Sequence, residues 1–253
     1  MLSEESSDIP LRWIPVEELG ENEWIFCYPS MDRNCIEKTK RELVDLAVKK
    51  VRFTGNTIVK GCSVLGKGKN SIVIEGLMNE RTVACKILRS DASRKDMKWE
   101  EEMLRRANSI SVGPKLVGAG NRVLVMERVY GCTLDEFLKK AGKEEITIMI
   151  SGLLDQARAL DKAKIRHKEL ANASRHVIVD RVNPTIIDFE SVSLNCNGHN
   201  VAAICQYIFI RRMENLIRLS KKALIELIRN YRRNPTEKNF LHLKETIIQN
   251  ISR

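Results

Sequence analysis

The sequence predicts an α+β protein in two parts, with strands in the first half and helices in the second. The β-branched runs Thr57–Val64 and Ser71–Gly76 end in turn residues, and Arg81–Leu88 follows a turn at Asn79; all three favour strands. After Gly131, apolar residues recur at helical spacing. Strands followed by helices are typical of the α+β class. We therefore expect a small β-rich lobe and a mainly helical lobe.

The first 55 residues are expected to form an N-terminal extension with one helix. Cys35–Val51 has apolar residues near one face and oppositely charged pairs four residues apart on the other, and either Asp32 or Asn34 is suited to cap it. Prolines punctuate the preceding segment. We assign no function to this extension.

Two lobes follow the extension. Residues 56–129 are expected to form the β-rich lobe, completed by a helix over Asp96–Ala107 and a strand over Arg122–Val129. Residues 130–253 are expected to form the helical lobe. Its predicted elements are helices at Leu134–Ala141, Glu144–Ala163, Val201–Asn230 and Thr236–Ile251, short strands near Val177–Val179 and Thr185–Ile187, and a polar turn at Asn195–Gly198.

The composition excludes several classes of protein. An apolar fraction of 43% and a charged fraction of 30% in 253 residues indicate a globular chain with a real core. No apolar run is long enough to span a bilayer, and the acidic start Met1–Pro10 is not a secretory signal. The seven cysteines include no C-x-x-C pair and are expected to be reduced thiols. We expect a cytoplasmic protein with no membrane partner.

Positive charge is concentrated at the C-terminus. The formal net charge is +10, and residues 211–253 hold eleven Lys or Arg against four Glu. Such an excess is typical of a surface that binds RNA or an acidic partner. The alternative is a solvated helical face without a partner. The sequence leaves both interpretations open.

A glycine-rich segment lies between two of the predicted strands. Gly66-Lys67-Gly68 allows the backbone to approach a phosphate closely, and the two lysines 67 and 69 add positive charge. Ser71 stands where a third glycine often follows. A G-x-G pattern alone is more typical of a hairpin turn, so the phosphate-binding interpretation depends on the strand that follows, which ends near Lys86.

Three further motifs occur in a set order. Val83-Ala84-Cys85-Lys86 closes an apolar strand with a lysine, and a lysine between apolar neighbours needs a partner if it is buried. His167–Leu170 places a carboxylate in a loop, and Ile186–Glu190 places another at the end of an apolar strand. Protein kinases use this order for the phosphate-binding lysine, the catalytic acid and the metal-binding aspartate.

On these motifs the chain resembles the small atypical protein kinases: the RIO kinases, the kinase of the KEOPS tRNA-modification complex and, above all, archaeal RIO-like serine/threonine kinases. The resemblance implies a two-lobed protein-kinase-like fold that binds ATP with Mg²⁺ or Mn²⁺ in a cleft between the lobes. It implies that Lys86 pairs with Glu100, which precedes Leu104 by four residues as in the family. It also implies that backbone groups of Glu127 to Val129 bind the adenine, with Met126 behind it.

The predicted catalytic segment departs from the usual kinase pattern. Glu169 stands in place of aspartate, and its extra methylene moves the carboxylate by about 1 Å, a displacement that can cost roughly 10²-fold in rate. The resemblance makes Asp188 the metal ligand. His176 stands where asparagine usually binds a second metal, and it is a candidate metal ligand, phosphate donor or packed histidine. Asn172 is an alternative ligand. Since imidazole suits Mn²⁺ better than Mg²⁺, we expect a preference for Mn²⁺.

The resemblance favours ATP-dependent transfer to a serine or threonine hydroxyl, on a protein substrate or on the protein itself. Glu169 would then orient the acceptor and Lys86 the phosphates. A nucleotide-binding pseudokinase or slow ATPase, acting as a switch in an assembly that contains RNA or protein, is the alternative. Glu169→Gln discriminates between the two, because it should abolish transfer but leave a switch function intact.

Overall fold

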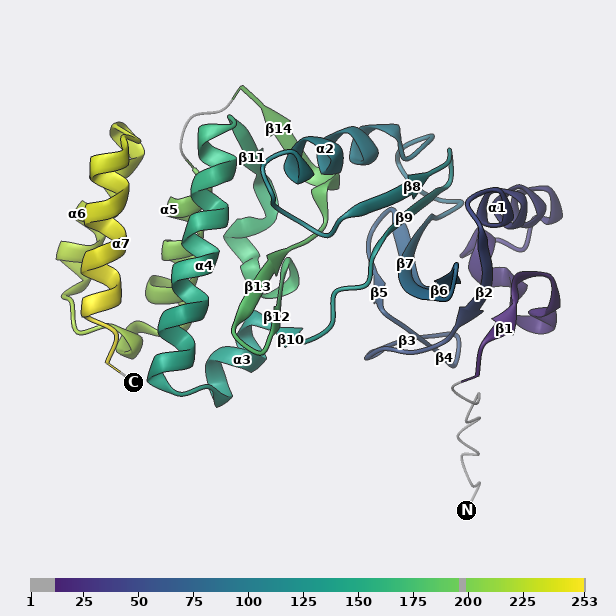
Figure 1. Ribbon diagram of the computed structural model, residues 1–253, viewed down its shortest axis with the longest axis horizontal. Coiled ribbons are helices and arrows are strands. Elements are labelled where there is room, and N and C mark those ends of the chain that lie inside the picture. The colour runs from purple at the N-terminus through teal and green to yellow at the C-terminus, as the bar shows by residue number, and fades with distance from the viewer. Residues whose placement is uncertain (1–11, 196–198, 253) are drawn as a thin grey trace, which may run out of the picture. The chain divides into compact units, whose positions relative to one another are not determined.

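The computed structural model describes residues 12–195 and 199–252, and its chain divides into two compact units. Met1–Glu102 with Lys115–Arg128 form the first unit, and Met103–Pro114 with Val129–Arg253 form the second. Figure 1 shows an antiparallel sheet in the first half of the chain and mostly helices in the second. The α+β class expected from the sequence is confirmed at this level.

The first unit is built on a seven-stranded antiparallel sheet. Six strands follow the order β1-β2-β6-β7-β9-β8, and β5 pairs with β6 outside this path. A separate hairpin joins β3 to β4. The strands are β1 (Ile14–Pro15), β2 (Val48–Arg52), β3 (Thr57–Val59), β4 (Cys62–Val64), β5 (Gly66–Lys67), β6 (Ser71–Met78), β7 (Arg81–Leu88), β8 (Leu116–Ala119) and β9 (Val123–Glu127).

The segment expected to be an extension shares the core of this sheet. Two 3₁₀ helices, η1 (Val16–Glu18) and η2 (Gly20–Cys27), precede α1 (Arg33–Asp45), whose N-terminus is capped by the Asp32 side chain. Phe26 and Leu43 are fully buried in one cluster with sheet residues such as Ile74. The described part of this segment, residues 12–55, therefore contributes both strands and core to the first unit.

Two details of this region differ from expectation. The helix predicted over Cys35–Val51 ends at Asp45, because Ala47 takes a positive φ of 59° and the chain then enters β2. The strand predicted over Thr57–Val64 is a hairpin, which turns at two residues with positive φ, Lys60 and Gly61.

The expectation of only reduced thiols was wrong. Cys27 and Cys35 form a disulfide, because the turn between η2 and α1 brings their Cα atoms to 5.6 Å. Cys62, Cys85, Cys132 and Cys205 are free thiols. Cys196, together with the rest of 196–198 in the predicted polar turn, lies outside the described residues.

The second unit is mainly helical. Its long helix α4 (Lys143–Lys162) contacts α5, α7 and β13 and buries one apolar face. The other helices are α3 (Leu134–Lys140), the 3₁₀ helix η3 (Lys168–Arg175), η4 (Phe189–Ser191), α5 (Asn200–Cys205), η5 (Gln206–Arg212), η6 (Glu214–Leu216), α6 (Lys221–Arg233) and α7 (Glu237–Gln249), and α2 (Lys98–Asn108) ends in this unit. The strands are β10 (Cys132–Thr133), β11 (Ile165–His167), β12 (Val177–Asp180), β13 (Asn183–Ile186) and β14 (Val192–Leu194).

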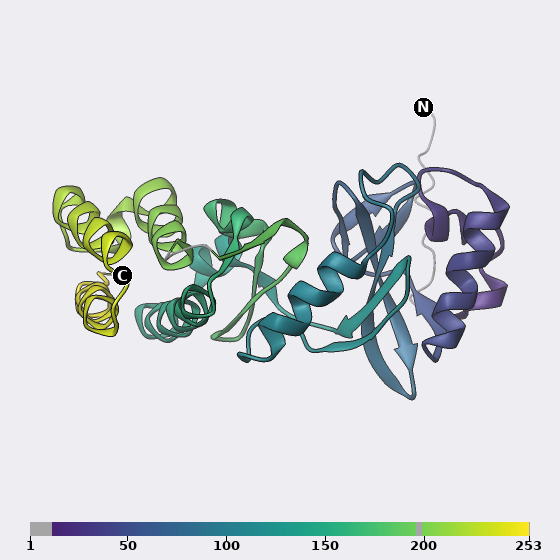
Figure 2. The ribbon, with the colours of Figure 1, turned by 90° about the horizontal axis from the view of Figure 1, so that it is seen from above.

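The continuous helix predicted over Val201–Asn230 is divided. The α-helix α5 continues as the π-helix η5. Ile217 then forms an isolated β-bridge with Ile251, and α6 begins after its own N-cap, Ser220. Helices α6 and α7 then lie side by side (Figures 1 and 2). Among the described residues, no helix has the length and hydrophobicity needed to cross a membrane.

Candidate functional site

The glycine-rich segment of the first unit forms a short hairpin between β5 and β6. Gly66 pairs with Val73, and the Gly68 amide donates to the Ser71 carbonyl at 2.8 Å. The Arg89 guanidinium donates to the Gly68 carbonyl at 2.9 Å and fixes the loop to the end of β7. The loop therefore has a defined conformation.

The hairpin itself does not require its two glycines. Neither Gly66 nor Gly68 has a positive φ. A Cβ added at Gly66 would meet nothing within 4 Å, and at Gly68 the nearest atoms would be those of Ser71 at 3.6 Å, an ordinary contact. Glycine at these positions leaves open space beside the backbone, which a closely approaching ligand such as a phosphate needs.

The side chains around the hairpin differ in their exposure. Lys67 is exposed, and its ammonium lies 4.9 Å from the centre of the Tyr28 ring. Arg89 lies over the same ring at 5.1 Å. Its guanidinium also binds both carboxylate oxygens of Asp91, at 2.8 and 2.7 Å, so its charge is balanced there. Ser71, in contrast, is 2% exposed and packs inside the hairpin as the first residue of β6.

Lys86 and Glu100 form a buried ion pair within the first unit. The Lys86 ammonium lies 2.5 Å from a Glu100 carboxylate oxygen, and the residues are 4% and 2% exposed. Arg94 binds the other carboxylate oxygen at 2.9 Å. Burial of charges is costly unless they are paired, so these contacts hold Lys86 in place. Of the three neighbouring glutamates, the structure pairs the one expected from the sequence with Lys86.

Strand register brings the hairpin and the lysine together. Gly66 pairs with Val73, and Val73 pairs with Lys86 on the next strand. Because neighbouring strands lie about 4.8 Å apart, Gly66 and Lys86 are roughly 10 Å apart across β5, β6 and β7. Gly66 and Lys86, two of the phosphate-binding candidates of the first unit, therefore lie in one row of the sheet.

The strand expected to bind adenine is β9. Met126 is half-buried and pairs with Ala84, next to Lys86 along the sheet. The Glu127 amide donates to the Lys115 carbonyl at 2.8 Å, so this N–H is already used. Val129 is half-buried and begins the longer segment of the second unit.

In the second unit, three of the predicted residues lie together. His176 Nε2 is 4.0 Å from a Glu169 carboxylate oxygen, and its Nδ1 is 3.8 Å from an Asp188 oxygen. The imidazole therefore lies between the two carboxylates. Glu169 is in η3 and Asp188 follows β13, so tertiary structure brings the loop acid and the strand-end acid together through this histidine.

Asp188 has an unusual backbone conformation. Its φ is +69° and its ψ is 78°, a left-handed conformation that costs a non-glycine residue about 1–3 kcal/mol. The Ile187 amide before it donates to the His176 carbonyl at 2.9 Å, and the Ile187 carbonyl lies 3.0 Å from His167 Nε2. These two contacts hold this residue beside His176.

His167 is neutral at neutral pH. Burial lowers the pKa of this imidazole, which is 2% exposed. Because a carbonyl only accepts a hydrogen bond, the Nε2 that faces Ile187 must carry the proton. The ring also stacks edge-on against Phe189 and His176, with centroids 5.4 Å and 5.6 Å away. His167 thus supports the segment that carries Asp188.

The donor atoms near Asp188 fit a divalent cation. Asp188 and Glu190 each offer a carboxylate oxygen, within 4.8 Å of one another. His176 Nδ1 lies 3.8 Å from an Asp188 oxygen but is not part of this acidic group. Oxygen donors suit Mg²⁺ and an imidazole suits Mn²⁺. Asn172 is exposed in a kink of η3, and its side chain forms no hydrogen bond within the part of the chain that the structure describes. His176 therefore lies beside Asp188, and Asn172 stays the alternative ligand that the sequence offers.

A buried polar network anchors the start of this segment, and sequence reasoning missed it. The Asn200 side chain accepts from the His167 amide at 2.9 Å and donates to the Ile165 carbonyl at 2.7 Å. The Asp161 carboxylate at the end of α4 accepts from the Asn200 side chain at 2.8 Å and from the Tyr231 hydroxyl at 2.8 Å. The only signal in the sequence was a polar residue before an apolar run, which is equally typical of a helix cap.

A scan of protein-family models finds none that matches this chain, and a search of curated proteins finds no similar sequence. The fold and the site define an α+β protein with a glycine hairpin beside a buried lysine in one unit and a carboxylate–histidine–carboxylate cluster in the other.

Proposed function

We propose that this protein is an ATP-dependent kinase of the atypical, RIO-like kind, which transfers a phosphoryl group to a serine or threonine hydroxyl. The observation that carries the proposal is the row formed by Gly66, Val73 and Lys86 across three strands, with Lys86 held by Glu100. A backbone that a phosphate can approach closely and a fixed ammonium are two of the features that bind ATP phosphates.

The proposed reaction is transfer of the γ-phosphoryl group of ATP to an acceptor hydroxyl. The acceptor oxygen forms a bond to the γ-phosphorus, the bond from that phosphorus to the β,γ-bridging oxygen breaks, and ADP leaves. The hydroxyl proton passes to the Glu169 carboxylate, which acts as the base. Lys86 neutralises phosphate charge. The backbone amide of Glu127 already donates to the Lys115 carbonyl, so we assign the Glu127 carbonyl to the adenine.

The metal candidates contribute charge. Asp188 would hold the divalent cation, with Glu190 and His176 as further donors. Such a cation neutralises the negative charge that develops on the phosphates during transfer. The neutral side chain of His167 keeps the Asp188 segment in position through the Ile187 carbonyl.

Transfer is tested with the purified protein and γ-labelled ATP, in Mg²⁺ or in Mn²⁺, with the protein itself as acceptor. We expect label on the wild type and none on Glu169→Gln or Asp188→Asn. The matched control is Asp180→Asn, an exposed carboxylate at the end of β12 in the same hairpin, which should label like the wild type. More label with Mn²⁺ than with Mg²⁺ is expected if His176 is a ligand, and equal labelling would remove it from the site.

Nucleotide binding is measured separately by calorimetry with ATP and Mg²⁺. Binding by the wild type that is weakened by Lys86→Met supports the first-unit half of the site. Absence of binding at millimolar ATP refutes the proposal. ATP binding by the wild type without any transfer of label would favour the alternative, a nucleotide-binding pseudokinase. In that case Glu169→Gln should bind ATP as the wild type does.

A further inference from the structure

The positive charge of the C-terminal region is concentrated on one helix. Helix α6 carries five cations and one acid in 13 residues, whereas α7 carries two of each sign. The two helices lie side by side (Figure 2). Their difference in charge therefore comes from their residues and not from their place in the fold. The cations of α6 are Lys221, Lys222, Arg229, Arg232 and Arg233.

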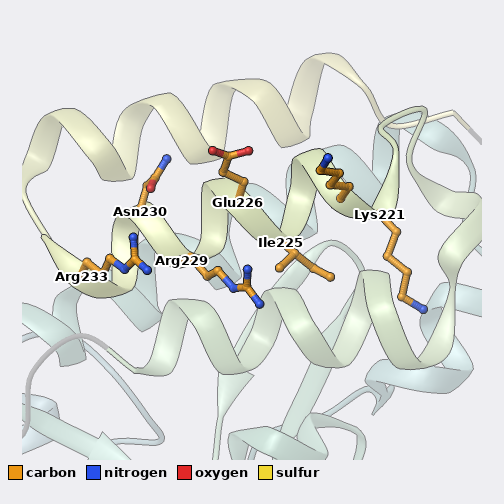
Figure 3. Close-up of a pocket in the computed structure, with 7 residues that line it drawn as sticks. Lys221, Ile225, Glu226, Arg229, Asn230 and Arg233 are labelled. Carbon is orange, nitrogen blue, oxygen red and sulfur yellow. The ribbon is translucent and has the colours of Figure 1, made fainter.

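Three of these cations form a stripe along α6. Lys222, Arg229 and Arg233 are separated by seven and four residues, which places them within about 40° of one another around the helix and over roughly 16 Å of its length. All three are exposed. They line a hollow of about 560 Å³ together with Ile225, Glu226 and other residues of the helix (Figure 3). The apolar face of α6 points elsewhere and is buried: Leu224, Ile228 and Tyr231.

The stripe is not neutralised by its surroundings. Within 12–195 and 199–252, none of these three side chains forms an ion pair, although elsewhere in the same unit Lys244 binds Asp155 at 2.6 Å. Glu226 is the one acid among the residues that line the hollow. Four cations and one acid, Glu226, therefore line the hollow, and this net positive face is available to an anionic partner.

We propose that this face of α6 binds the phosphate backbone of a nucleic-acid duplex. Guanidinium groups match phosphate oxygens with two parallel hydrogen bonds, and two of the three stripe cations are arginines. The length of the stripe corresponds to about five base-pair steps of 3.4 Å along one strand. Binding of this kind reads charge and shape, and it carries no sequence preference.

The composition of the face argues against the other polyanions. A protein interface needs a desolvated apolar or aromatic centre, and the only apolar side chain in the hollow is the half-buried Ile225. Binding of single strands relies on aromatic side chains on which bases stack, and the hollow has none. A regular row of phosphates, which a duplex presents, fits the stripe better than either.

The test measures the binding of a short labelled RNA duplex by fluorescence anisotropy, without nucleotide or metal, from about 50 to about 200 mM salt. The same sequence as a DNA duplex and as a single strand, and polyglutamate, are the comparison ligands. One triple variant replaces the three stripe cations by glutamine. The matched control replaces three exposed cations of the first unit by glutamine: Lys38, Arg41 and Lys49. Both variants lower the formal net charge from +10 to +7.

We expect the stripe variant to bind either duplex about 10-fold or more weakly at low salt, and its slope of log affinity against log salt to fall by about 3, or roughly 0.9 for each phosphate contact removed. The control should keep the wild-type slope, and both variants should keep the wild-type melting temperature because the changed side chains are exposed. Equal losses in the two variants, tighter binding of the single strand or of polyglutamate, or no binding at low salt would each overturn the proposal. Because no ATP is present, the outcome does not depend on kinase activity.

Discussion

Replacement of Gly66 or Gly68 by alanine should change ATP affinity and the free energy of unfolding in opposite directions. At Gly66 an added Cβ meets no atom within 4 Å, and at Gly68 it makes an ordinary contact of 3.6 Å with Ser71. Neither residue has a positive φ. Alanine at such positions stabilises a protein by about 0.4–1 kcal/mol, because it reduces the conformational entropy of the unfolded chain. We therefore expect Gly66→Ala and Gly68→Ala to raise the free energy of unfolding slightly.

The effect on ATP should be opposite. A methyl group in the open space keeps the phosphates away from the backbone and removes one charge-assisted hydrogen bond, which contributes about 1.5–3 kcal/mol. That loss corresponds to roughly 10- to 100-fold weaker ATP binding, since each 1.4 kcal/mol is tenfold.

Gly76 in β6 provides the opposite control. A Cβ at this position would lie 2.6 Å from Cys85 Sγ and 2.9 Å from a Val48 methyl, both in the buried core. Overpacking of this kind costs about 1–3 kcal/mol. Gly76→Ala should therefore lower the free energy of unfolding, while it leaves ATP affinity unchanged in the protein that remains folded.

The assays are urea unfolding followed by circular dichroism and calorimetric titration with ATP and Mg²⁺. Unchanged ATP affinity in both hairpin variants would show that no phosphate approaches these glycines, and the hairpin would then be an ordinary turn. A fall in stability of either hairpin variant would show instead that the loop conformation differs from the one described.

Three further outcomes are expected. Asn200→Ala leaves buried backbone groups without a hydrogen-bond partner and should lower the free energy of unfolding by about 2–4 kcal/mol, measured in urea. Hydrogen bonds from Thr133 lower the pKa of Glu136 below its usual 4.5. The stabilisation that Glu136 contributes is therefore present above pH 4.5 and is lost as the pH falls through the lowered pKa. Glu136→Gln should flatten this part of a plot of melting temperature against pH. Burial raises the pKa of the thiols of Cys85 and Cys205 to about 12, so iodoacetamide should label neither in the native protein at neutral pH and both after denaturation, as mass spectrometry would show.

Local sequence patterns predicted most elements because they depend on side-chain periodicity. The alternation in Arg81–Leu88 and the helical spacing after Gly131 are properties of a few neighbouring residues, and both match the strand β7 and the helix α4. The patterns failed where a turn interrupts them. Residues up to Val51 have an apolar face compatible with a helix, but the chain pairs with β6 from Val48 onward, and pairing with a distant strand is not encoded in the local pattern.

The candidate site was only partly accessible from the sequence. A lysine in an apolar strand required a partner, and the structure supplies Glu100. No pattern indicated that Arg94 binds the same carboxylate, because it lies in an irregular segment before α2. Nor did any pattern place His176 between Glu169 and Asp188, since this arrangement depends on how η3 and β13 pack.

By itself the sequence determined the α+β class, the order of the motifs and the residue types available for chemistry, because these depend on composition, periodicity and spacing along the chain. Only the tertiary structure decided that residues between 12 and 55 share the core of the sheet, that Cys27 and Cys35 are bonded and that Asn200 anchors the segment before Glu169. Each of these depends on contacts between residues far apart in sequence or on the geometry of a turn. Such contacts follow from the packing of whole elements, which no local window of the sequence contains.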